Sequence, residues 1–251
     1  MSRERPMGIL QKSSDLISLL AVRGPLTPAE IAEEIGMPRS SVYRFAEALG
    51  QVQMTETLAD SRVKVSLRWL RLADAARAAM VEWAGARPVL DELARDTGQT
   101  TFLSVPRGDE VVCIDWSQGR GISVLILKPG RALPLYAGAA GRVTLAFRDE
   151  DPAAYLAQAP FPAFTRRTLR TGKQLQDDID AIRARGFSIS DEDVTDGIGA
   201  LGVPLFGAGG RLRGALSLAG LAEDLRTSQI ELVEHLRASA AVLTDALETS
   251  P

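Results

Sequence analysis

Hydrophobic residues near the start of the chain recur at intervals of three and four, the period of an amphipathic helix. The first series predicts a helix that ends near Gly24. Thr27 and Glu30 have the spacing of a capping box, and Pro28 suits a first helical turn, so a second helix begins there. Because Gly36 ends this helix and a third begins soon afterwards, the pattern predicts two short helices that meet across a glycine turn.

The third helix is amphipathic, with Val42, Phe45 and Leu49 on one face. Its other face suits DNA, since arginine donates two hydrogen bonds to guanine and hydroxyls contact phosphates or base edges. Two alternating segments, 51–56 and 62–67, predict a hairpin, or wing, after this helix. The predicted DNA-contacting residues are Thr27, Pro38, Arg39, Ser40, Ser41, Tyr43 and Arg44 in the helices and Arg62 and Lys64 in the wing. A three-helix bundle used for protein contacts is the alternative.

The next segment predicts one continuous helix from about Ser66 to Ala84. Leu67, Leu70 and Trp83 belong to a series of apolar residues on one face of this helix. That face is too apolar to be exposed to water, so we expect another element to cover it. The same helix of a second copy is the simplest cover for that side. Packing against the rest of its own chain is the alternative.

Beyond this helix the pattern mixes helical and strand-like segments. Strands are predicted at 101–105, 111–116, 122–127, 199–206 and 212–219, and helices at 88–97, 139–147, 152–159, 174–185 and 228–247. This order predicts an α+β fold in which helices cover an antiparallel sheet, the arrangement called GAF-like. The glycines of 207–210 predict a hairpin turn, because a phosphate-binding loop would be followed by a helix that begins with lysine and serine or threonine.

The length of 251 residues and the 45% hydrophobic content fit a two-domain globular protein. We divide the chain into a winged helix-turn-helix domain at 1–66, a linker and dimerisation helix at 67–84 and a sensor domain at 85–251. Residues 1–80 carry a net charge of +2 and the remainder −5, which favours DNA binding by the first part. No apolar run is long enough to span a membrane and the start lacks a signal-peptide pattern, so we expect a cytoplasmic protein.

Side chains for catalysis are few. His235 is the only histidine and lies in the last amphipathic helix, and the only cysteine, Cys113, occupies a strand position typical of a core residue. The acidic residues of 191–196 could hold Ca²⁺ or Mg²⁺, but they lack the spacing of an EF-hand. We therefore predict no enzyme activity, no metal and no cofactor.

Several segments of the chain form a recognisable set of motifs. They are Leu-Thr-Pro-Ala-Glu-Ile-Ala at 26–32, Gly-Met-Pro-Arg-Ser-Ser-Val-Tyr-Arg at 36–44, Leu-Pro-Leu-Tyr-Ala-Gly-Ala-Ala-Gly-Arg at 133–142, and stretches of 186–198, 203–206 and 215–220. These segments resemble the isocitrate lyase regulator (IclR) family of transcription regulators, and the similarity spans nearly the whole chain. Where that family usually has Gly-aromatic-Val and Tyr-x-Leu-Gly in its wing, this chain has Gln-Val-Gln at 51–53 and Lys-Val-Ser-Leu at 64–67.

The resemblance implies a regulator that binds a double-stranded DNA operator and a small organic effector, a carboxylate or an aromatic compound. It implies a homodimer, or a tetramer on DNA, with recognition helices about one DNA turn apart or a multiple of it. The effector-binding residues that it implies are Leu135, Gly138, Ala139, Ala140, Asp191, Asp193, Val203, Pro204, Ser217 and Ala219. Many members of the family have a polar residue where this chain has Ala219, so the pocket of this chain should be more apolar. We therefore expect aromatic or alicyclic acids as ligands.

Two alternatives remain from the sequence. The altered wing fits a ligand-binding or scaffolding protein whose helix-turn-helix no longer binds DNA. The residues assigned to the effector pocket also fit a purely structural role.

Overall fold

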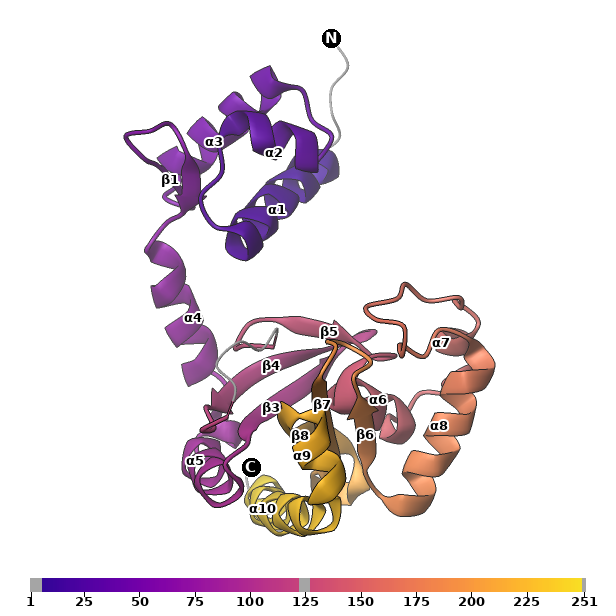
Figure 1. Ribbon diagram of the computed structural model, residues 1–251. Helices are drawn as coiled ribbons and strands as arrows, with labels where there is room; N and C mark the ends of the chain where they lie inside the picture. The colour runs from indigo at the N-terminus through magenta and orange to yellow at the C-terminus, as the bar shows by residue number, and fades with distance from the viewer. Residues whose placement is uncertain (1–5, 122–126, 250–251) are drawn as a thin grey trace. The chain divides into compact units, whose positions relative to one another are not determined.

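The computed structural model describes residues 6–121 and 127–249, and it divides the chain into two compact units, Met1–Ala79 and Met80–Pro251 (Figure 1). We call them the N-terminal unit and the C-terminal unit. The strand predicted at 122–127 lies, apart from Leu127, outside the described residues. No helix among the described residues is long and apolar enough to cross a membrane.

The N-terminal unit has the predicted helices and wing, built around one hydrophobic core. The capping box forms as expected: Thr27 Oγ1 accepts from the Glu30 amide at 3.3 Å, and the Glu30 carboxylate accepts from the Thr27 amide at 2.7 Å. The core consists of Leu16, Leu20, Leu26, Ile31, Met37, Val42, Ala46, Leu49 and Val63. The elements are α1 (Pro6–Arg23), α2 (Pro28–Glu34), α3 (Arg39–Gln51), β1 (Thr55–Thr57), β2 (Val63–Val65) and α4 (Arg68–Ala78).

The wing is shorter than the sequence predicts. Helix α3 continues to Gln51, where a strand was expected to begin, because the Val52 amide still donates to the carbonyl of Ala48. Gln53 then takes a left-handed conformation with φ of 59°, and the Met54 amide donates to the Leu49 carbonyl at 2.8 Å. Residues 51–54, which were predicted to begin the first strand, therefore form the end of α3 and the turn after it.

The predicted continuous helix from Ser66 to Ala84 is wrong. Helix α4 ends at Ala78, and Met80 leaves the helical region with φ of −90° and ψ of 61°. Met80 and Trp83, which flank and end the short 3-10 helix η1 (Val81–Trp83), pack against the core of the C-terminal unit. Because these two side chains pack into that core, α4 cannot continue through residues 80–83 in its own direction. The sequence shows only that they are apolar.

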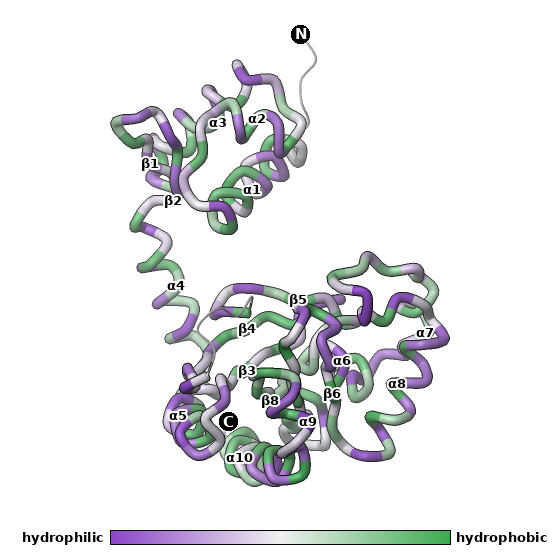
Figure 2. Tube along the Cα trace, in the orientation of Figure 1, coloured by the Kyte–Doolittle hydropathy of each residue, from purple (hydrophilic) through white to green (hydrophobic). Residues whose placement is uncertain are grey.

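The start of α4 is fastened to the N-terminal unit. Ser66 Oγ donates to the carbonyl of Gln53, and Trp69 Nε1 donates to the carbonyl of Met54 at 2.8 Å. Arg68 donates to the carbonyl of Val52 at 2.6 Å. These bonds occupy backbone acceptors that the end of α3 leaves free. Helix α4 therefore extends the winged-helix domain. None of its residues is fully buried in the chain, and hydrophobic positions recur along it (Figure 2).

The C-terminal unit is a six-stranded antiparallel sheet between two layers of helices, as the α+β prediction requires. The strand order is β5-β4-β3-β8-β7-β6. Helices α5 and α10 cover one face, α6 covers the other, and α8 packs outside α6 (Figure 1). The elements after η1 are α5 (Ala86–Thr97), β3 (Thr100–Arg107), β4 (Glu110–Ser117), β5 (Ala132–Pro134), α6 (Gly138–Phe147), α7 (Ala153–Leu156), α8 (Gly172–Arg185), β6 (Ser188–Asp191), β7 (Ile198–Phe206), η2 (Ala208–Gly210), β8 (Leu212–Leu221), α9 (Ala222–Thr227) and α10 (Gln229–Thr249).

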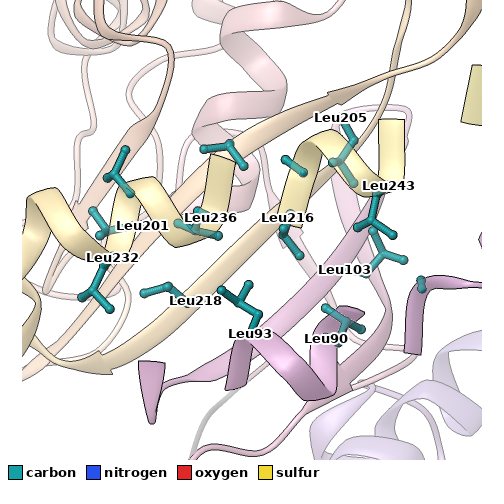
Figure 3. Close-up of a cluster of buried hydrophobic side chains, with 14 of the residues drawn as sticks. Leu90, Leu93, Leu103, Leu201, Leu205, Leu216, Leu218, Leu232, Leu236 and Leu243 are labelled. Atoms are coloured by element: carbon teal, nitrogen blue, oxygen red, sulfur yellow. The ribbon is translucent and has the colours of Figure 1, made fainter. Parts of the chain in front are cut away.

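The two faces of the sheet differ in side-chain size. Along β8, Leu216 and Leu218 belong to the leucine-rich core under α5 and α10, which Figure 3 shows closely. The alternate residues Ala215, Ser217 and Ala219 face α6. Small residues on this face allow the helix to approach the sheet and leave room between them.

Candidate functional site

The exposed face of α3 carries the side chains predicted to contact DNA. Arg39, Ser40, Tyr43 and Arg44 are all exposed, with Tyr43 at 59%. Pro38 is exposed at the N-cap position and Ser41 is half-buried. Arg39 and Arg44 form no ion pair with the described residues, so both guanidiniums are available to an external partner.

The other residues predicted to contact DNA are engaged inside the unit. The Thr27 hydroxyl serves the capping box. Arg62 pairs with Asp60 at 2.7 Å, and Lys64 pairs with Glu56 at 3.0 Å. Both pairs are partly exposed, so the wing cations are balanced by carboxylates of the same wing. The two arginines of α3, which have no partner among the described residues, therefore place positive charge on its exposed face.

A cavity lies between α6 and the sheet of the C-terminal unit. Its cavity volume is about 60 Å³, and the empty space around it, about 540 Å³, includes open solvent at the mouth. Most of its surface is apolar, with hydroxyl groups at three positions. The lining residues are Phe102, Leu127, Leu133, Gly138, Ala139, Ala140, Ser190, Val194, Thr195, Ile198, Gly199, Ala200, Ser217 and Ala219.

Two glycines allow α6 to pack closely against its neighbours beside this cavity. Gly138 begins α6 with φ of +71°, and a Cβ there would lie 3.2 Å from Leu133 Cδ1. Gly202 faces the same helix from β7, where a Cβ would lie 3.1 Å from the carbonyl group of Ala139. Larger residues at either position would push α6 away from the sheet.

A buried ion cluster holds the start of α6 from behind. Asp193 accepts a hydrogen bond from the Gly138 amide at 3.0 Å and another from the Ser190 hydroxyl. Arg142 lies with Nε 3.5 Å from the Asp193 carboxylate and donates to Asp178 at 2.8 Å and to the Ile189 carbonyl. The side chains of Arg142 and Asp193 are 5% and 3% exposed. One guanidinium therefore faces two carboxylates behind the cavity wall.

Five of the ten residues predicted for the effector pocket line the cavity: Gly138, Ala139, Ala140, Ser217 and Ala219. The other five do not. Leu135 is in the core beneath α6, and Val203 points to the opposite face of the sheet. Pro204 pairs with Ala215 farther along β7.

Asp191 and Asp193, which the resemblance implies as effector-binding residues, do not line the cavity, whereas Val194 and Thr195 of the same segment do. Asp193 is buried in the ion cluster, and Asp191 pairs with Arg226 at 2.6 Å and with Arg167 at 2.8 Å. Hydrogen bonds from the Gly197 amide and from Arg226 lower the pKa of Glu192. Among the described residues, no group of three histidine, cysteine or acidic side chains is placed to hold a metal.

Nine lining residues were not predicted from the sequence, among them Phe102, Ser190 and Ala200. The register of the strands would have indicated two of them, since Phe102 pairs with Ser217 and Ala200 pairs with Ala219. These pairings follow from the fold and are not visible in the local pattern.

Cys113 packs behind the cavity wall, against Phe102 and Ala219. It is fully buried, as predicted for a core residue. Burial, together with the Asp115 carboxylate, raises the pKa of its thiol to about 12.

We expect this thiol to remain protonated and unreactive toward Ellman's reagent in the folded protein at about pH 8, near the pKa of an ordinary cysteine. Reaction should become complete in urea. A Lys173→Cys variant, which adds a thiol at an exposed position, supplies the control and should react with one additional equivalent at once. Rapid reaction of the unmodified folded chain would contradict the burial of Cys113.

A winged helix-turn-helix with an exposed cationic recognition face, joined to a helix-covered sheet with a small-molecule cavity, defines the class of effector-binding transcription regulators. Two family models match the chain: the IclR helix-turn-helix domain over residues 10–58, and the C-terminal domain of the bacterial transcriptional regulator IclR over residues 80–244. The chain therefore belongs to the IclR family.

Relatives support this assignment along the whole chain. The transcriptional regulator BhcR of Paracoccus denitrificans is 30% identical over 96% of this chain and 85% of its own length. KipR of Bacillus subtilis is 27% identical over 83% and 84% of the two chains. The crystal structure of a putative IclR regulator from Silicibacter sp. TM1040 has a TM-score of 0.78 at 25% identity, covering 97% and 98% of the chains.

An IclR homologue from Microbacterium hydrocarbonoxydans, crystallised with 4-hydroxybenzoate, shares the fold at a TM-score of 0.81. It is 19% identical, and the match covers 96% of this chain and all of the other.

Proposed function

We propose that the start of α3 recognises the operator and that the cavity beside α6 binds the effector, a small carboxylate or aromatic compound. The assignment of α3 rests on its exposed face, which presents Arg39, Ser40, Tyr43 and Arg44. The two arginines form no ion pair with the described residues. A helix N-terminus also favours phosphate. The protein acts in the cytoplasm as a regulator without catalytic activity of its own.

Control of DNA binding then follows from a shift between conformations. An effector that binds one arrangement of the two units more tightly changes the population that fits the operator. Helix α4 is fastened to the N-terminal unit, and the chain leaves the helical conformation at Met80. This break is the place at which the arrangement changes.

The protein acts as a homodimer, or as a tetramer on DNA. Leu67, Leu70 and Leu72 of the linker segment are 68%, 63% and 41% exposed in the single chain. Apolar side chains gathered on one helix favour association with a second copy. A dimer supplies two recognition helices for the two half-sites of an operator.

Fluorescence anisotropy of the purified protein against its own upstream DNA tests the proposal, with random DNA as competitor at a fixed salt concentration. Binding that resists the competitor is the expected result. Binding no tighter than to random DNA would favour the alternative, a ligand-binding protein whose helix-turn-helix does not read DNA.

Arg39→Ala and Arg44→Ala should each weaken operator binding by about 1 to 3 kcal/mol if the arginine contacts a guanine. Phosphate contacts would give a smaller loss that is equal for all DNA sequences. The matched control is Arg95→Ala, which removes an exposed arginine from α5 and should leave binding unchanged. Unchanged binding in both α3 variants would exclude α3 as the recognition helix.

A further inference from the structure

The cavity beside α6 has a chemical character that narrows the ligand class, and the inference drawn from it rests on the function proposed above. None of the lining residues is ionisable. A carboxylate in this cavity would have no cationic side chain among the described residues that line it.

The protein's own charges near the cavity are already paired. The Gly138 amide, at the start of α6, donates to the carboxylate of Asp193 at 3.0 Å. Asp193 and Asp178 share Arg142. Arg185 lies 3.7 Å from Asp178, so two guanidiniums match two carboxylates. The cluster therefore offers the cavity no net positive charge, and an anionic ligand would lose its hydration without gaining a cationic side chain.

Two of the three hydroxyls that line the cavity, those of Ser217 and Thr195, make no hydrogen bond with the described residues. Ser217 is the more deeply buried of the two, at 4% exposed. The hydroxyl of Ser190, by contrast, already donates to Asp193. Because a buried hydroxyl without a partner is costly, Ser217 requires a donor or acceptor from whatever fills the cavity.

An aromatic side chain forms part of the wall. Phe102 lines the cavity and stacks on Trp116, with ring centroids 6.2 Å apart. Flat aromatic surfaces pack well against other rings. The remaining wall consists mainly of aliphatic residues and alanines.

We infer that this cavity binds an uncharged compound with a single ring, aromatic or alicyclic, that carries a hydroxyl or carbonyl oxygen hydrogen-bonded to Ser217. Uncharged oxygen satisfies the hydroxyl without the desolvation cost of a carboxylate. The ring fills the apolar space against Phe102. This narrows the expectation of aromatic or alicyclic acids to their uncharged counterparts.

Isothermal titration of the full chain at neutral pH compares matched probes. Benzyl alcohol, phenol and cyclohexanone represent uncharged rings, and benzoate and cyclohexanecarboxylate represent the acids. We expect the best uncharged probe to bind at least about tenfold more tightly than either acid. Equal or tighter binding of an acid overturns the inference, and so does the failure of all three uncharged probes to bind at millimolar concentration.

Two serines of the sheet provide a matched pair of variants. Ser217→Ala should weaken the best uncharged probe by roughly threefold to tenfold, the range for one hydrogen bond. Ser104→Ala should not change it, because Ser104 is also buried and makes no side-chain hydrogen bond but lies outside the cavity. Equal affinity of the wild type and Ser217→Ala overturns the assigned contact.

Operator binding without any probe separates this inference from the proposed function. Failure of operator binding overturns the proposed function whatever the probes do. Normal operator binding combined with a preference for acids overturns only the ligand class.

Discussion

Replacement of Arg142 by alanine should lower the free energy of unfolding of the C-terminal unit by about 3 to 5 kcal/mol, the range for removing one partner of a buried ion pair. Arg142 is 5% exposed and is the nearest cation to Asp193, which is also buried. Without the guanidinium, the buried Asp193 carboxylate would lose its cation, and Asp178 would keep only Arg185, at 3.7 Å. The Ile189 carbonyl would also lose its donor.

Urea unfolding followed by circular dichroism at neutral pH measures this loss. The matched control is Lys173→Ala, which breaks the Lys173–Asp177 pair on the surface of α8, where the side chains are 86% and 65% exposed. Exposed pairs of this kind contribute less than about 1 kcal/mol. A loss of similar size in both variants would show that the buried cluster does not stabilise the unit.

Leu236→Ala should also destabilise the C-terminal unit strongly, by about 2 to 5 kcal/mol, because it leaves a cavity in a close-packed core. Leu236 is fully buried on α10 among leucines of α5 and the sheet (Figure 3). The same urea experiment measures the effect. Ile230→Ala, on the same helix but 79% exposed, should change stability by less than about 0.5 kcal/mol. A small loss for Leu236→Ala would place α10 outside the core.

The N-terminal unit shows which features can be predicted from residues that are close together in the sequence. Thr27 and Glu30 form a capping box within four residues, and the burial of Val42 and Leu49 follows from helical spacing. Such features depend on neighbours close in sequence, so the sequence predicts them correctly. The wing was predicted less well, because the end of α3 is set by the left-handed Gln53.

The cavity shows the opposite case. Gly138, Ser217 and Ala219 were assigned through the family resemblance, and the fold brings them together. Phe102 and Ala200 join them only through the register of β3, β7 and β8. Asp193 was assigned to the same pocket, but it is buried behind the wall against Gly138 and Arg142, which lie more than fifty positions away in the sequence.

The sequence by itself determined the class of fold, the helix-turn-helix and the family, because these depend on periodicity, capping and short motifs. Only the tertiary structure decided where the linker helix ends, which residues line the cavity and what charge lies behind its wall. Met80 and Trp83 end the helix by packing into the core of the C-terminal unit. Their apolar character is visible in the sequence, but the core that receives them is assembled from distant strands and helices.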